Sequence, residues 1–100
     1  MKKLIVATAL LAAISAPVSA EEQASCEQVA RIAKHIMTAH QEGESLATIM
    51  GLAKGDGLIE KMTVQAYESN RYFSQEVQMR EINGFRDRWY LLCYKAKALE

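Results

Sequence analysis

The chain has few of the residues and patterns from which β-sheets and long linkers are built. Its only proline is Pro17, and no stretch alternates apolar and polar residues for long. Beyond residue 20, valine occurs only at Val29, Val64 and Val77. No internal repeat and no low-complexity segment is present. These absences argue against a sheet and favour a helical domain.

The chain also has no excess of charge of either sign. It contains 12 Lys and Arg residues and 12 Asp and Glu residues, so its formal net charge is zero. Without Lys2 and Lys3, which belong to an N-terminal leader, the formal charge is −2. Such a charge provides no strong field for nucleic acid or for an anionic membrane, and we expect neither as a partner.

The first 20 residues have the layout of a secretory signal peptide. A basic start at 2–3 precedes an apolar run at 4–16, and Pro17 follows that run. Small residues then provide a cleavage site after Ala20. The run has about 13 residues, fewer than the roughly 20 that a membrane-spanning helix needs. We predict a cleaved signal peptide, 1–20, and a single small helical domain, 21–100, that has no stable membrane insertion after cleavage.

The chain has only two cysteines, and they lack the Cys-x-x-Cys spacing of redox motifs. A lipidated cysteine would directly follow the apolar run, whereas Glu21 and Glu22 come before Cys26. Because exported chains are oxidised, we predict a disulfide bond between Cys26 and Cys93. It would close a loop of nearly 70 residues, which the chain-entropy model values at about 4 kcal/mol. A domain this small is marginally stable without such a crosslink.

Apolar residues at steps of three and four predict four helices in the domain. Each has a capping residue at its start, at Ser25, Ser45, Asp56 and Ser74. Residues that end helices follow the first three, at Gly43, Gly55 and Ser69-Asn70. The first helix is expected to begin at Cys26 and to turn Arg31, Lys34 and Gln41 toward solvent. The predicted fold is all-α, a compact four-helix domain whose first and last helices are linked by the disulfide.

The last predicted helix, from Ser74 to Lys97, has the most pronounced apolar side. That side comprises Met79, Ile82, Phe85, Trp89, Leu92, Cys93 and Ala96. It includes the only tryptophan of the chain. We therefore expect this stripe to form the core and the shorter helices to cover it. Asn83-Gly84 lies within the helix and is a candidate kink.

Two segments near the C-terminus have a distinctive pattern. Residues 65–72 read QAYESNRY, and residues 78–94 read QMREINGFRDRWYLLCY. With the signal peptide and the early cysteine, this pattern resembles a family of small exported proteins of proteobacterial genomes and their phages and prophages. Members often have Pro near position 70, where this chain has Asn70, so its connector is less constrained. The resemblance implies a Gram-negative periplasm and a phage-related role, and it transfers no functional residues.

The sequence contains no arrangement typical of a catalytic or metal site. His35 and His40 are five residues apart, about 140° around a helix, whereas zinc-binding pairs on a helix use spacings of three or four. Ser45 and Ser74 occupy capping positions rather than a nucleophile elbow. The paired acidic residues lie in a predicted tail and turn, and the glycines lack the spacing of a phosphate-binding loop. We therefore expect no enzyme activity, no cofactor and no metal ion.

Arginine and aromatic residues are concentrated in the last third of the chain. The candidate binding residues are Arg71, Tyr72, Arg86, Arg88, Tyr90 and Tyr94, with Phe73 beside the first two. Such residues dominate the energetic hot spots of protein interfaces. Arg86, Tyr90 and Tyr94 follow one another at steps of four, so one helix edge would present all three. The alternative is that the aromatic residues 72, 73 and 94 fill the edge of the core and that the arginines are merely solvated.

These features favour a function by non-catalytic binding of another envelope or secreted protein in the periplasm, as an inhibitor, an adaptor or an immunity-like protein. Two alternatives stay open, and so does the oligomeric state. The family resemblance alone points to a phage-related envelope factor, such as one for superinfection exclusion. Size, helical class and a single disulfide are shared with acid-stress periplasmic chaperones, and two histidines with twelve carboxylates allow a charge change near acid pH.

Overall fold

A computed structural model describes residues 17–98 of the chain, with side chains described from residue 26 onward. This part folds into four α-helices, α1 Pro17–Gln41, α2 Leu46–Ala53, α3 Gly57–Tyr67 and α4 Gln75–Ala98. No β-strand occurs between residues 17 and 98, so the predicted all-α class is confirmed. Within the same range, no helix is both long enough and apolar enough to cross a membrane.

The first helix begins earlier than predicted. α1 starts at Pro17 rather than at Cys26, and the expected capping residue Ser25 lies inside it. Proline is favoured in the first turn of a helix, where its missing N–H has no partner to lose, and the Ala, Glu and Gln residues that follow are good helix formers. Of the predicted signal peptide, residues 1–16 lie outside the described residues, and cleavage after Ala20 stays a prediction.

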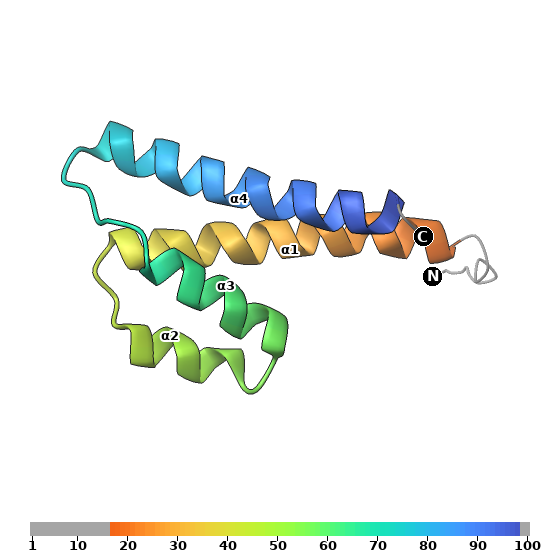
Figure 1. The fold of residues 1–100 in the computed structure, drawn as a ribbon, viewed down its shortest axis with the longest axis horizontal. Helices are drawn as coiled ribbons and strands as arrows, with labels where there is room; N and C mark the ends of the chain where they lie inside the picture. The colour runs from red at the N-terminus through yellow and green to blue at the C-terminus, as the bar shows by residue number, and fades with distance from the viewer. Residues whose placement is uncertain (1–16, 99–100) are drawn as a thin grey trace, which may run out of the picture.

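The two long helices, α1 and α4, run antiparallel and lie side by side over most of their length (Figure 1). α2 and α3 form a short hairpin on one side of α1, with α3 packed more closely against α1 than α2 is. The turn after α1 and the connector 68–74 between α3 and α4 lie together at one end of this arrangement (Figure 1). Loops far apart in the sequence therefore meet at that end.

The core forms where α1, α3 and α4 meet. Its buried side chains are Ala33, Ile36, Met37, Met62, Ala66, Ile82, Phe85 and Trp89. The rings of Phe85 and Trp89 meet edge to face with 6.5 Å between their centroids, which is a favourable arrangement for aromatic pairs. The core thus draws its largest side chains from the middle of α4.

Only the middle of the apolar stripe of α4 is covered, whereas the whole stripe was expected in the core. Ile82, Phe85 and Trp89 are buried, but Met79 is 45% exposed and Leu92 is 53% exposed. The reason is length, because α2 has 8 residues and α3 has 11, whereas α4 has 24. At 1.5 Å per residue, the two short helices span only about 12 and 17 Å. Both ends of α4 therefore leave apolar side chains on the surface.

The other helix boundaries follow the predicted capping residues. The hydroxyl of Ser45 and the carboxylate of Asp56 accept hydrogen bonds from backbone N–H groups of the first turns of α2 and α3. The hydroxyl of Ser74 does the same at the start of α4. α2 ends one residue before Gly55, because Lys54 already adopts the left-handed conformation with φ 53°. α4 continues through Asn83-Gly84 without a break in the helix.

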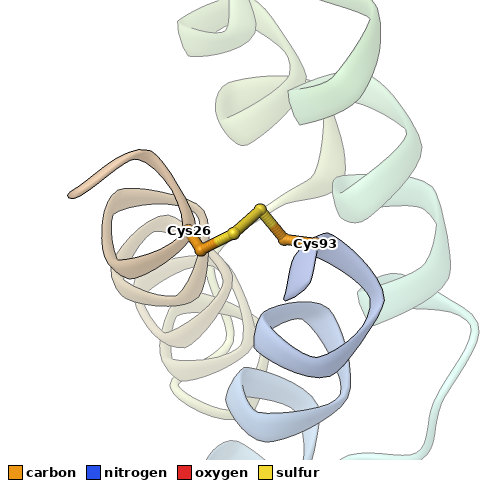
Figure 2. The surroundings of a disulfide bond; sticks show 2 residues. All are labelled: Cys26 and Cys93. Atoms are coloured by element: carbon orange, nitrogen blue, oxygen red, sulfur yellow. A yellow bond between two sulfur atoms is a disulfide. The ribbon is translucent and has the colours of Figure 1, made fainter. Parts of the chain in front are cut away.

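A disulfide bond between Cys26 and Cys93 joins α1 to α4, which confirms the predicted pairing (Figure 2). The two residues are 67 positions apart in the sequence and their Cα atoms are 5.6 Å apart. Cys26 is buried, so the bond lies at the contact between the two helices. The closed loop contains α2, α3 and most of α4, and the crosslink therefore restricts most of the unfolded chain.

Candidate binding surface

The candidate binding residues occupy two separate parts of the molecule. Arg71 and Tyr72 lie in the connector 68–74, whereas residues 86, 88, 90 and 94 lie in the second half of α4. Because a helix rises 1.5 Å per residue, Gln75 and Tyr94 are about 28 Å apart along the axis of α4. The two groups therefore belong to different surfaces.

Arg86 and Tyr90 meet residues of α1 at a surface hollow of about 320 Å³. We call it the basic hollow; it is lined by Glu27, Ala30, Arg31, Lys34, Arg86 and Tyr90. The α1 residues recur at steps of three and four, and the two α4 residues are four apart, so each set lies on one side of its helix. The antiparallel packing of α1 and α4 brings the two sides together.

The lining of the basic hollow contains three cationic side chains and one carboxylate, although the whole chain has no net charge. Arg31 and Lys34 are exposed. The Nε atom of Arg86 lies 2.9 Å from Oδ1 of Asp87, which is the one ion pair within the described part of the chain. Both partners are exposed, so the pair contributes little to stability. The terminal nitrogens of the Arg86 guanidinium take no part in it and can donate to a ligand.

The basic hollow is suited to binding rather than to covalent chemistry. Guanidinium and ammonium groups donate hydrogen bonds to carboxylates, and a guanidinium can do so with two parallel bonds. Tyr90 adds a flat ring and a hydroxyl group at the rim. No histidine, cysteine or serine is among the lining residues, so the hollow contains no pair of a nucleophile and a base.

The two other candidates on α4 lie outside the basic hollow. Arg88 is about 200° around the helix from Arg86, and its guanidinium carbon lies 5.6 Å from the centre of the Phe85 ring. It therefore covers the core through a cation–π contact. Tyr94 lies one turn beyond Tyr90 and is 56% exposed, so it extends the surface of α4 and does not fill the core edge.

In the connector, Arg71 packs on the end of α1. Its Nη2 donates to the backbone carbonyl of Gln41 at 3.4 Å. The same nitrogen would lie 3.0 Å from a Cβ atom at Gly43, so the guanidinium lies against that glycine. A cation is favourable here because the last carbonyls of a helix lack partners and its C-terminal end is partially negative. Tyr72 is half-buried, as the core-edge alternative expected of it, whereas Phe73 is fully exposed.

Two polar residues at the end of α1 hold the connector in place, and the sequence interpretation missed the role of both. Gln41 is only 2% exposed, although it was expected to face solvent. Its Nε2 donates to the carbonyl of Asn70 at 2.8 Å, and its Oε1 accepts from the N–H of Tyr72 at 2.9 Å. Nε2 of His40, also buried, lies 2.7 Å from the carbonyl of Ser69, so this nitrogen is the donor. Buried polar groups are costly unless they are hydrogen-bonded, and these are.

Spacing alone contains a signal for the position of Gln41. It follows Ala33 and Met37 at steps of four, and both of these residues are fully buried. Its polarity led to its assignment to the opposite face of α1. Its partners Asn70 and Tyr72 are about 30 residues away and come from another loop, so no local pattern could identify them.

Tyr67 completes the polar contacts at this end of the molecule. Its ring packs on that of His40 with 4.3 Å between centroids, and its hydroxyl donates to the carbonyl of Glu44 at 2.9 Å. Burial, followed by the nearby Glu44 carboxylate, raises the pKa of Tyr67 above its ordinary value of 10. Both effects favour the neutral phenol that makes the hydrogen bond.

A second hollow, of about 310 Å³, lies between α1 and the α2–α3 hairpin. Its lining is largely apolar and consists of Ile32, His35, Ile36, Ile49, Leu52 and Ile59. In the part of the chain from residue 26 to residue 98, no three His, Cys, Asp or Glu side chains are grouped so that they could hold a metal ion. His35 thus belongs to an apolar surface.

Comparison of the chain with protein-family models, with curated proteins and with solved structures finds no match. The geometry of the surfaces is therefore the basis for a function. Of the candidate residues, Arg86 and Tyr90 are the pair that the fold joins to charged residues of a second helix.

Proposed function

We propose that this protein acts in the periplasm by binding another envelope or secreted protein, without catalysis, as an inhibitor, an adaptor or an immunity-like protein. The observation that supports this proposal is the basic hollow, where Arg86 and Tyr90 of α4 face Arg31 and Lys34 of α1. Arginine and tyrosine in a shallow depression are typical of the residues on which binding energy depends.

The chemistry of the basic hollow favours an acidic segment of the partner. Three cations outnumber the single carboxylate of Glu27, so Asp or Glu side chains of a partner find more donors than repulsion. Charge complementarity of this kind speeds association and selects among partners. The binding should therefore weaken as salt screens the charges.

The scaffold supports a binding role because it presents the hollow in one fixed shape. The Cys26–Cys93 bond joins the same two helices that line the hollow. A surface that is ordered before it binds loses less conformational freedom on association. The disulfide also fits the proposed compartment, because such bonds persist in the oxidising periplasm and the first 20 residues have the layout of an export signal.

Affinity capture from periplasmic extract under oxidising conditions tests this function. The baits are the wild-type protein, an Arg86→Ala/Tyr90→Ala variant, and Arg80→Ala as a matched control. Arg80 is exposed on α4 but does not line the basic hollow. We expect a protein that the wild type and the control retain and that the double variant loses. If no retained protein depends on Arg86 or Tyr90, the proposed function is wrong.

A further inference from the structure

The connector 68–74 presents one aromatic side chain entirely to solvent. Phe73 has a relative exposure of 104%, greater than that of any other large apolar residue among the described side chains. It lies at the end of the molecule where the chain passes from α3 to α4 (Figure 1). A phenylalanine on a mobile loop would be unremarkable, so the question is how firmly this loop is held.

The backbone is hydrogen-bonded on both sides of Phe73. On one side, the N–H of Tyr72 donates to Oε1 of Gln41, and its carbonyl accepts from the side chain of Gln78. On the other side, the carbonyl of Ser74 accepts from the N–H of Gln78 at 2.9 Å. Phe73 is therefore held between two anchored neighbours and cannot move freely with its loop.

The anchors themselves belong to the packed interior. Gln41 and His40 are buried at the end of α1, and they hold the carbonyls of Asn70 and Ser69. Two buried polar side chains thus serve to fix a surface connector rather than to join two helices of the core. The result is a rigid loop with an aromatic side chain at its tip.

We propose that Phe73 is the anchor of a second protein-binding surface, and that it inserts into an apolar pocket of a partner protein that is rimmed by basic side chains. A fixed aromatic side chain is the usual centre of an interface hot spot, because it buries a large area on binding and loses little freedom.

The charges around the connector favour a protein partner over a lipid surface. Glu42 and Glu44 in the turn after α1, Glu68 at the start of the connector and Glu76 in the first turn of α4 are all exposed. Against them, Arg71 packs back on the end of α1. Anionic lipid attracts basic segments and repels such an acidic rim, and one aromatic residue buries too little area for stable membrane binding. A pocket rimmed by Lys or Arg is complementary to it.

This surface is distinct from the basic hollow. Gln75 and Arg86 are about 16 Å apart along the axis of α4, and no residue of the connector lines the hollow. The inference therefore does not depend on the proposed function, and each can fail without the other.

Photocrosslinking from position 73 tests the inference. The full-length protein is produced in its host with p-benzoylphenylalanine in place of Phe73, exported, and irradiated in intact cells. A matched protein has the same probe in place of Val64, an exposed apolar residue on α3. We expect the probe at 73, and not the probe at 64, to form an adduct that mass spectrometry maps to one apolar segment of a single protein.

The affinity of that purified protein for variants at position 73 completes the test. Because Phe73 is fully exposed, Phe73→Ala leaves the fold intact, which circular dichroism verifies. We expect Phe73→Ala to weaken binding by about tenfold or more, and Phe73→Trp to stay within about threefold of the wild type. Any of three results overturns the inference: no adduct specific to position 73, unchanged affinity of Phe73→Ala, or Phe73-dependent binding to vesicles of phosphatidylethanolamine and phosphatidylglycerol.

Discussion

The side-chain carbonyl of Gln41 accepts a 2.9 Å hydrogen bond from the backbone N–H of Tyr72, 31 residues further along the chain. This bond joins the end of α1 to the start of α4. The Cys26–Cys93 disulfide joins the same two helices near their other ends. Both proposed surfaces therefore belong to a body that is fastened at each end, by a covalent bond at one and by buried hydrogen bonds at the other.

Replacing Gln41 should loosen the connector before it affects the rest of the fold. Gln41→Ala leaves the N–H of Tyr72 and the carbonyl of Asn70 without their partner, and we expect a loss of about 2 to 3 kcal/mol in the free energy of unfolding. Hydrogen exchange at the Tyr72 amide should accelerate more than exchange in the core of α4. Glu42→Ala, a change at the exposed neighbour, is the control and should leave both quantities unchanged. Unchanged protection of Tyr72 in Gln41→Ala would show that the bond does not hold the loop.

Two glycine substitutions should change stability in opposite directions. Gly51 lies inside α2, and a Cβ atom there meets nothing within 4 Å, so Gly51→Ala should stabilise the protein by about 1 kcal/mol. Gly43 has φ +92°, and a Cβ atom there would lie 3.0 Å from Nη2 of Arg71, so Gly43→Ala should destabilise it by about 1 to 2 kcal/mol. Urea denaturation measures both changes. Equal effects of the two substitutions would contradict this assignment.

The contribution of Tyr67 to stability should fall at alkaline pH. Its raised pKa means that the folded state holds the phenol proton more tightly than the unfolded chain does. The contribution is therefore complete below the unfolded pKa of about 10 and is lost as the pH rises through the folded pKa. Between about pH 9 and about pH 11, the wild type should lose more free energy of unfolding than Tyr67→Phe. The other three tyrosines are common to both proteins, so equal losses would exclude this role of Tyr67.

The fold class, the disulfide and several caps could be predicted because they depend on local spacing or on a count. Ser45 and Asp56 cap helices through bonds to N–H groups two or three residues away, and two cysteines allow one pairing. The burial of Gln41 depends on partners in a distant loop, and the exposure of Leu92 depends on how far two short helices reach. Neither property exists within a single helix.

The same distinction applies to the candidate surface. Steps of four placed Arg86 and Tyr90 on one side of α4, and the structure joins them at one hollow. Arg31 and Lys34 were expected only to face solvent. Their position opposite Arg86 depends on how α1 and α4 are aligned, which is a relationship across more than 50 residues of sequence. The basic character of the hollow could therefore not be predicted from either helix alone.

Reduction of the disulfide should lower the melting temperature strongly. The bond is worth about 4 kcal/mol in the chain-entropy model, and each kcal/mol shifts the melting temperature of a domain of this size by about 4 to 8 °C. We expect a decrease of about 15 to 30 °C when reductant is added. A Cys26→Ser/Cys93→Ser variant is the control, because its melting temperature should be low and insensitive to reductant. Equal melting temperatures of the wild type in both conditions would show that the bond does not stabilise the fold.

Calorimetric titration of the captured partner into the oxidised protein tests the role of the basic hollow most directly. We predict that Arg86→Ala raises the dissociation constant by about tenfold or more, whereas Arg80→Ala on the same helix stays within about twofold of the wild type. The same dissociation constant for all three proteins would contradict a function based on this surface.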